Sequence, residues 1–395
     1  MRPAASPRAR PPLPDTRVVL DIGSRVLKAG ICGEPSPRVV LDSAAAASHI
    51  LGRRVDSLWN LDMMHVAAPR GAQERFVELV RVLNRILRTV WQDHLLVDPS
   101  AARVLCAHNP MLIGAVQEAI CEVLLHRIGT TAVSFIDSHT LALVAAGRAT
   151  GLVVDVGYLE TCVMPVYGGR PIMRATRTSP RGARRLCASL GALLGAPDAP
   201  WANELGARAL LVGAPVPPGG RTACPLDIDA FSARYGSSTV ADMHCSAGGH
   251  ALVVPGWVRE RAAEVLFEPG DEDEASIVEC VVACVKDVPI DARREVLESV
   301  VLAGGTATIP GFALRVQREL ERALGACEHK MGTGSGGAFA YTRVLNAPRA
   351  ADAPLPMAAL PSSLLVWIGG SLAGSLGSDG TLQITREQWL AAERT

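Results

Sequence analysis

The chain has 395 residues, enough for two medium-sized domains, and 49% of them are hydrophobic. Its 39 basic and 39 acidic residues cancel, and only 4% of the residues are aromatic. Such a chain has neither the net field that attracts nucleic acid nor many aromatic surfaces for base stacking. No uninterrupted apolar run of 18 residues occurs, so we expect no membrane span and no nucleic-acid partner.

The first 15 residues contain five prolines and three arginines. Proline interrupts the amphipathic helix of a transit peptide, so a disordered tail over 1–15 is the favoured prediction. A targeting role stays open, because this basic segment has no acidic residue before Asp15.

Apolar strands and amphipathic helices follow from residue 16 onward. Apolar runs predict strands at Arg17–Ile22, Val26–Ile31, Pro37–Leu41 and Val104–Ala107. Apolar residues at helical spacing predict helices at Glu74–Trp91, Met111–Arg127 and Ser138–Ala146. The residues from 43 to the first of these helices are predicted to be a short irregular segment.

The opening pattern returns 134 residues later, where Asp155-Val156-Gly157 separates the strands Gly151–Val156 and Thr161–Tyr167. This repeat suggests an internal duplication. Region 171–257 is rich in Gly, Pro and Ala and predicts a peripheral subdomain. After it we predict a strand at Ser299–Ala303 and helices at Trp257–Phe267, Glu274–Val285, Phe312–Leu324 and Leu364–Leu376. Two similar halves of mixed strands and helices place the chain in the α/β class.

Three glycine turns at strand ends are candidate phosphate-binding sites. The first combines Asp21, Gly23 and Ser24 with Lys28. Glycine lets backbone N–H groups approach a phosphate, and the serine hydroxyl donates a further hydrogen bond. The aspartate can hold a metal-bound water, and the lysine neutralises phosphate charge. Taken alone, this pattern also fits a plain β-hairpin.

The second turn, Asp155 to Gly157, has the same form as the first and can close on a phosphate chain from the opposite side. The third turn joins a strand to a helix through Gly304, Gly305 and Thr306, which suits the approach of a nucleotide. Three such turns in this order indicate a nucleotide site more specifically than one turn does.

The remaining motifs predict no catalytic or metal site. A GxGxxG pattern begins at Gly332, but it follows no apolar strand and opens no helix, so we assign it to a loop. Four possible zinc ligands have a spacing that fits no common zinc pattern: Cys224, His244, Cys245 and His250. The nine histidines form no visible catalytic triad.

At these turns the sequence resembles the actin family. VVLDIGSRVLKAGICGEPSPRVVL (18–41) and GLVVDVGYLETCVMPVYGG (151–169) resemble the two phosphate loops of actins. VVLAGGTATIPGF (300–312) resembles their adenosine-binding segment, and VWIGGSLAGSL (366–376) a stretch near their C-terminus. The resemblance runs from about Arg17 to Leu390 and is weakest over 43–90 and 170–256.

Two further segments resemble a divergent class within the family more than they resemble actin itself. They are HLLVDPSAARVLCAHNP (94–110) and LFEPGDEDEASIVECVVACVKDVPIDARREV (266–296). The class they resemble is the actin-related protein at the pointed end of the dynactin filament.

The resemblance implies an actin-like fold, in which two similar α/β halves flank a nucleotide cleft and the peripheral subdomains are reduced. The first half is implied at 16–150, with a reduced small subdomain at about 43–90. The second half is implied at 151–364, with a peripheral subdomain at about 171–257. Residues 365–395 are implied to return to the first half.

The resemblance also implies ATP or ADP with Mg²⁺ as cofactor. The residues implied to face the β- and γ-phosphates are Asp21, Gly23, Ser24 and Lys28. Those implied to lie opposite are Asp155 and Gly157. Those implied near the sugar and α-phosphate are Gly304, Gly305 and Thr306.

Four departures from the actin pattern affect the expected binding and hydrolysis of this cofactor. Arg25 replaces a glycine of the first loop, and Tyr158-Leu159 replaces an Asp-Gly pair of the second. Ser138 stands where actins have the glutamine that positions the attacking water, and Gly206-Ala207 stands where they have an adenine-contacting Lys-Glu pair. Because loss of a positioning group typically costs about 100-fold or more in rate, we expect no enzyme, or at most very weak ATP hydrolysis.

The weakly similar region 43–90 matches the part of actins that carries a loop inserted into the next subunit. The face that receives a neighbour, which includes 361–376, is retained in the sequence. The implied filament-interface residues are Trp367, Gly369, Gly370 and Gly374, although Trp367 equally fits a core position. A subunit that accepts a neighbour but offers no loop onward ends a filament.

We therefore expect a non-polymerising actin-related protein that caps the pointed end of the dynactin minifilament and supports dynein-driven microtubule transport. The expected partners are an actin-like filament subunit and other pointed-end subunits of dynactin, with dynein as an indirect partner, in the cytoplasm and cytoskeleton. The alternatives are an active ATPase or sugar kinase of the same superfold, and a nuclear actin-related chromatin subunit. The fold alone does not separate these functions.

Overall fold

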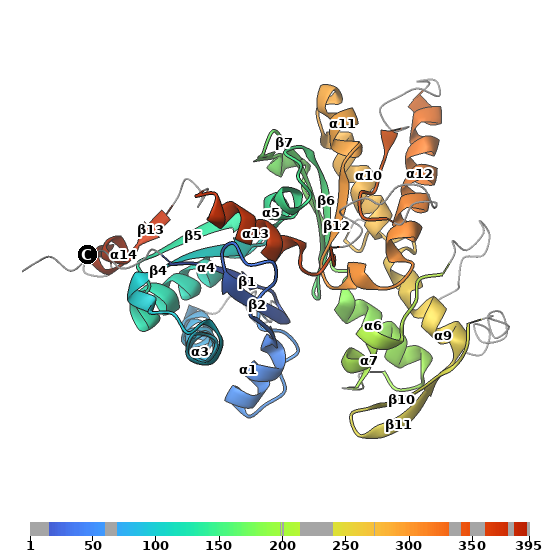
Figure 1. Cartoon of the computed structure of the whole chain (residues 1–395). Helices are drawn as coiled ribbons and strands as arrows, with labels where there is room; N and C mark the ends of the chain where they lie inside the picture. The colour runs from blue at the N-terminus through green and yellow to red at the C-terminus, as the bar shows by residue number, and fades with distance from the viewer. Residues whose placement is uncertain are drawn as a thin grey trace, which may run out of the picture.

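The computed structural model describes residues 16–59, 69–197, 199, 201–213, 240–271, 273–331, 341–347, 360–377 and 383–392. Within these ranges the chain is an α/β protein with two main sheets and helices packed around them (Figure 1). The predicted tail, the Gly332 loop and Cys224 lie outside the described residues. No helix in the described part is both long and apolar enough to cross a membrane. Its His, Cys, Asp and Glu residues form no group of three or more suited to a metal ion.

The first half is built on a six-stranded sheet with the order β13-β5-β4-β1-β2-β3. Strands β1, β4 and β5 run parallel, whereas β1, β2 and β3 form antiparallel hairpins. At the first turn, the N–H of Gly23 donates to the carbonyl of Val26 at 3.0 Å. A Cβ at Gly23 would lie 2.8 Å from that oxygen, so the tight turn requires glycine. The strands are β1 Thr16–Ile22, β2 Val26–Ile31, β3 Val39–Asp42, β4 Ala102–His108, β5 Ala132–Asp137 and β13 Gln383–Thr385.

Helices cover both sides of this sheet. Helix α3 buries Val80, Leu83 and Leu87 at helical spacing, as its sequence pattern predicts, and continues into a π-helical turn, Val90–Leu95. The helices of this half are α1 Ser43–Leu51, α3 Pro69–Thr89, α4 Gly114–Cys121 with the π-helical turn Glu122–Ile128, α5 Ser138–Ala145, α13 Leu365–Ser375 and α14 Arg386–Ala392.

The second half repeats the hairpin of the first. Strand β6 pairs antiparallel with β7 and parallel with β12, and the sheet order is β12-β6-β7-β8, with β9 also paired to β7. The strands are β6 Gly151–Val156, β7 Thr161–Tyr167, β8 Arg170–Pro171, β9 Arg177–Ser179 and β12 Val300–Ala303, and a separate hairpin holds β10 Met243–Ala247 and β11 His250–Val254. The helices are α6 Ala183–Leu193, α7 Ala202–Ala209, α9 Gly256–Arg261, α10 Ile277–Asp287, α11 Ile290–Leu297 and α12 Phe312–Met331.

The sequence analysis missed several elements. Strand β5 and helix α11 have no counterpart among the predicted elements, and α1 was predicted to be irregular. The alanine-rich sequence of α1 has a high helix propensity but little amphipathic pattern, so periodicity alone overlooks it. Helix α10 begins three residues later than predicted because Ser276 and Glu279 form a capping box.

Helices α5 and α13 pack together between the two sheets (Figure 1). A Cβ at Gly369 would lie 1.8 Å from the carbonyl oxygen of Leu141 in α5, so only glycine permits this approach. A Cβ at Gly370 or Gly374 would meet side chains of β1 and of the residue after β2. Trp367 is fully buried. The four residues expected to form a filament interface therefore pack against their own chain and are not exposed to a neighbour.

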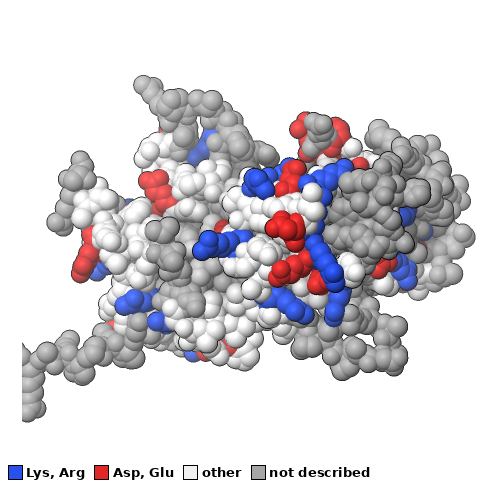
Figure 2. Space-filling view, turned by 90° about the horizontal axis from the view of Figure 1, so that it is seen from above, with Lys and Arg blue, Asp and Glu red and all other residues white. Residues whose placement is uncertain are grey.

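Charged side chains of both signs are interspersed on the face seen in Figure 2, which fits the neutral composition. An electrostatic nucleic-acid site requires a broad basic patch, and the described residues of that face carry no broad patch of one sign.

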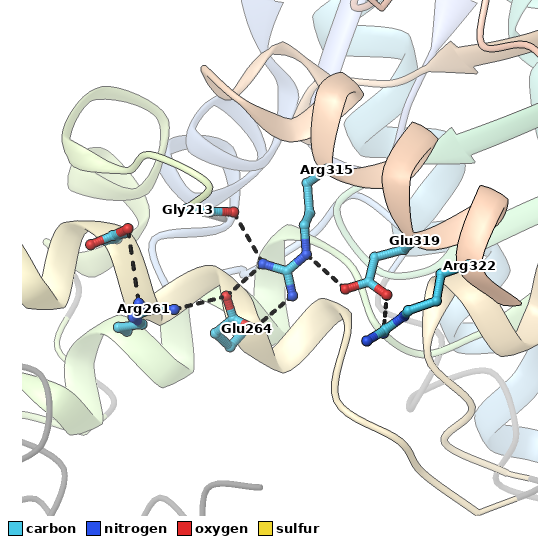
Figure 3. Close-up of polar contacts among 7 residues, drawn as sticks. Gly213, Arg261, Glu264, Arg315, Glu319 and Arg322 are labelled. Atoms are coloured by element: carbon cyan, nitrogen blue, oxygen red, sulfur yellow. Dashed lines mark hydrogen bonds and ion pairs between the residues drawn. The ribbon is translucent and has the colours of Figure 1, made fainter. Parts of the chain in front are cut away.

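A buried ion-pair network joins α12 to the residues that follow α9 (Figure 3). Both guanidinium ends of Arg315 donate to Glu264, at 2.9 and 3.0 Å, and its Nε donates to Glu319 at 3.0 Å. The Arg315 side chain is 4% exposed and the Glu264 side chain 7%. A fourth bond reaches the carbonyl of Gly213, and the guanidinium lies 4.7 Å from the ring centroid of Phe267. The network fixes three separate segments of the second half to one another.

Replacing Glu264 with Gln should lower the free energy of unfolding by about 3 kcal/mol, because Arg315 keeps its charge and loses a buried carboxylate. Chemical denaturation measures this loss. The control is Glu298→Gln, which removes an exposed partner of Arg294 and should have no measurable effect. Equal losses in the two variants would contradict a special contribution of the buried network.

Candidate functional site

The second and third glycine turns are in direct contact. Strand β12 lies beside β6 with Ala303 opposite Asp155, and Gly304 follows with a φ of 91°. A Cβ on Gly304 would lie 2.6 Å from Oδ1 of Asp155, so this position requires glycine for both conformation and space. The Thr306 hydroxyl donates to the carbonyl of Gly157 at 3.2 Å. The neighbouring Gly305 faces open space.

The first turn lies close to the second. Nζ of Lys28 donates to Oδ2 of Asp21 at 2.6 Å, and both side chains are largely buried. Burial raises the pKa of Asp155 to about 6, and the nearby Asp21 carboxylate adds to the rise while Lys28 opposes it. The structure therefore brings together the charged residues of the first two turns, which are 134 positions apart in the sequence.

The backbone of the first turn also contacts α1 and the residues that follow it. The carbonyl of Ser24 accepts from the N–H of Leu58 at 2.5 Å, and the carbonyl of Arg25 accepts from the N–H of Ser43 at 2.8 Å. The turn is thus held from the side of α1 as well as from its own hairpin.

The sequence analysis did not identify three polar residues at the carboxyl ends of β4 and β5, or Glu160, which meets them from the turn between β6 and β7. Nε2 of His108 lies 3.4 Å from Oδ1 of Asp137, at the carboxyl ends of β4 and β5. Asn109 donates to Glu160 at 3.2 Å, and burial raises the pKa of Glu160. Polar groups at the carboxyl ends of parallel strands are a recognisable signal. It was missed here because β5 itself was not predicted.

The hydroxyl of Ser138 is directed to the protein core. Its Oγ lies 3.2 Å from Nδ1 of His139, and Nε2 of His139 lies 3.2 Å from the carbonyl oxygen of Cys162. Burial lowers the pKa of His139 to about 4, so this imidazole is neutral at pH 7. The geometry therefore gives the Ser138 hydroxyl a partner within its own chain, the buried His139.

The second turn inserts two bulky side chains between the halves. Tyr158 and Leu159 are 9% and 8% exposed, and both belong to the hydrophobic cluster of the first half. The second turn therefore packs directly against the first half through these two side chains.

The residues present fit only part of a nucleotide. A polyphosphate suits the first and third turns, because Lys28 supplies a positive charge beside Asp21 and the space next to Gly305 is open. In contrast, a Cβ at Gly206 would lie 2.8 Å from the Sγ of Cys187, so α6 and α7 leave no room there for the expected adenine-contacting side chain. Because Tyr158 also fills space beside the second turn, the arrangement departs from the expected nucleotide site at two places, and we derive no catalytic step through a nucleotide.

Comparison with known proteins agrees with this architecture. The family model described as Actin matches residues 13–200 and 253–392. Among curated proteins, actin-related protein 2 of Acanthamoeba castellanii is 24% identical over 327 residues, covering 77% of this chain and 81% of that protein.

Replacing Asp155 with Asn should raise the free energy of unfolding at pH 7. The pKa of Asp155 is about 6 in the fold against an ordinary value of 3.8, so the folded state binds the proton more tightly. The contribution of Asp155 to the free energy of unfolding is most favourable below about pH 4, where its carboxyl is protonated. This contribution is lost as the pH rises through 6 and the buried carboxyl ionises. The gain should reach at most about 3 kcal/mol at pH 7 and vanish near pH 4. Denaturation at both pH values measures it, and a loss of stability confined to pH 7 would contradict the expectation.

Proposed function

The chain belongs to the actin family, and we propose that it is a non-polymerising actin-related protein that caps the pointed end of the dynactin minifilament. The observation that carries this proposal is helix α1. Directly after β3, Ser43–Leu51 forms a helix that is capped by Asp42, buries Ala44 and Ala47, and packs against α3. In actins this part of the chain leads into the inserting loop, whereas here its described residues fold back onto the first half.

A filament end needs one competent face and one altered face, because head-to-tail contacts propagate when both faces are present. The altered face in this proposal is that of α1. The competent face is that of α13, where Leu372 and Leu376 are 43% and 79% exposed. The buried Trp367 and its neighbouring glycines hold the helix in position, and the two leucines are available to a filament subunit.

The proposed partners are an actin-like filament subunit and other pointed-end subunits of dynactin, with dynein reached indirectly, in the cytoplasm and cytoskeleton. The support for these partners is the likeness of segments 94–110 and 266–296 to the pointed-end class. In the structure the first segment leads through β4 to the candidate site, and the second includes α10 and α11.

We also propose that the protein is not a working ATPase. The support is the core-facing Ser138 together with Tyr158 and Leu159 in the second turn. Purified protein incubated with Mg-ATP should release phosphate far more slowly than the median enzyme, which turns over about 10 times per second. The measurement is a coupled phosphate-release assay, and turnover near that median would overturn this part of the proposal.

The capping role predicts that the protein does not polymerise alone. Sedimentation at high concentration, under conditions that polymerise actin, should leave it in the supernatant. Labelled protein should bind a single end of an isolated dynactin minifilament, the pointed end. Decoration along the filament or at both ends would show that the α1 face still binds a further subunit.

The leucine variants test the opposite face. Leu376→Asp should weaken binding to the filament end by at least about 10-fold, because a charge would enter an apolar contact. The matched control is Leu96→Asp, since Leu96 is 74% exposed on a different part of the first half. If both variants bind the filament end as tightly as the unchanged protein, the filament contact does not include Leu376.

A further inference from the structure

The Tyr158 side chain connects both halves of the molecule. Its hydroxyl donates to Oδ1 of Asp56 at 2.5 Å and lies 3.1 Å from Oδ1 of Asn203. Asp56 follows α1 in the first half, whereas Asn203 lies in α7 of the second half. One phenol on the turn between β6 and β7 therefore contacts the small subdomain and the peripheral subdomain together.

The tyrosine ring is also held from the first turn. The guanidinium carbon of Arg25 lies 5.0 Å from the centroid of the Tyr158 ring, within the range of a cation–π contact. Arg25 in turn pairs with Asp42 at 3.2 Å. Arg25 and Tyr158, which both depart from the actin phosphate loops, thus contact one another across the halves.

Leu159 adds an apolar contact to this polar one. It projects from the second half, is 8% exposed, and packs in the cluster that contains the core of the first half. Burial of a leucine from one half within the core of the other favours the closed arrangement of the two.

The backbone fixes the turn that carries both side chains. The carbonyls of Gly157 and Tyr158 accept from the N–H groups of Ala183 and Arg184, at 3.0 and 2.9 Å. The N–H of Gly157 donates to the carbonyl of Glu160 at 2.9 Å. The first turn of α6 is thus bonded to this loop, which holds Tyr158 and Leu159 in their bridging positions.

We propose that Tyr158, Leu159 and Arg25 form a clasp that closes the cleft with the chain's own side chains, so that the closed form needs no bound nucleotide. The nucleotide of an actin ties the two halves together, and the clasp makes the same connection through direct contacts. A permanently closed subunit also presents one fixed surface to its neighbours. The inference does not depend on the capping role, and its test involves no filament.

The first arm of the test measures the unchanged protein. Its melting temperature should be the same with and without millimolar Mg-ATP, and a denatured extract should contain no stoichiometric nucleotide. A ligand that bound the folded state would raise the melting temperature by mass action. A clear rise with Mg-ATP, or one nucleotide per chain in the extract, would overturn the proposal.

The second arm removes the hydroxyl alone. Tyr158→Phe should lower the melting temperature by a few degrees and speed amide hydrogen exchange in 53–59 and at the start of α7, since both lose their contact with the phenol. The matched control is Tyr167→Phe, whose ring is 45% exposed on β7 of the same half and which should change neither reading. Unchanged exchange in Tyr158→Phe would overturn the clasp.

The third arm reopens the cleft. The double variant Tyr158→Asp with Leu159→Gly introduces the residues expected in actins, and it should melt lower than the unchanged protein. It should also gain a rise in melting temperature with Mg-ATP if the clasp is what excludes the nucleotide. A folded double variant with no such gain would show that other positions exclude it. If this variant does not fold, the first two arms still decide the proposal.

Discussion

The close approach of α13 to α5 is the constraint on which the rest of the structure depends. Three glycines let the helix lie where any side chain would collide, and the carbonyl of Leu141 occupies the space that a Cβ at Gly369 would need. Trp367 is fully buried in the same cluster, whose members come from both sheets. Because this cluster links β1 with β6 and β12, it determines where the strand ends, and hence the three turns, meet.

The three turns combine charged residues suited to a phosphate with bulky side chains that depart from the family pattern. The ion pair of Asp21 with Lys28 has charges suited to a polyphosphate, whereas Tyr158 and Leu159 of the second turn connect the halves directly. The small subdomain contributes Asp56 to that connection and α1 to the outer face, so changes on that side affect both. A subunit at the end of an assembly has no further subunit to accommodate on one face, so a fixed closed shape is compatible with the proposed role.

Much of the architecture was determined by the sequence itself. The repeated strand–Asp–x–Gly–strand pattern predicted the two hairpins, and apolar spacing predicted α3 and the start of α12, because these signals are local. The family followed from the same turns and is confirmed. The sequence also identified Tyr158-Leu159 as one of four departures from the family pattern.

Only the tertiary structure decided where those side chains point. Asp56 and Tyr158 are 102 residues apart, and no local pattern predicts that they share a hydrogen bond. The glycines of α13 looked suited to a partner, yet they contact their own chain, because spacing alone cannot tell which neighbour fills the space beside a glycine. Ser138 likewise faces His139 because β5 and α5 fix its direction. Such contacts depend on the packing of distant elements, which the sequence specifies only through the complete fold.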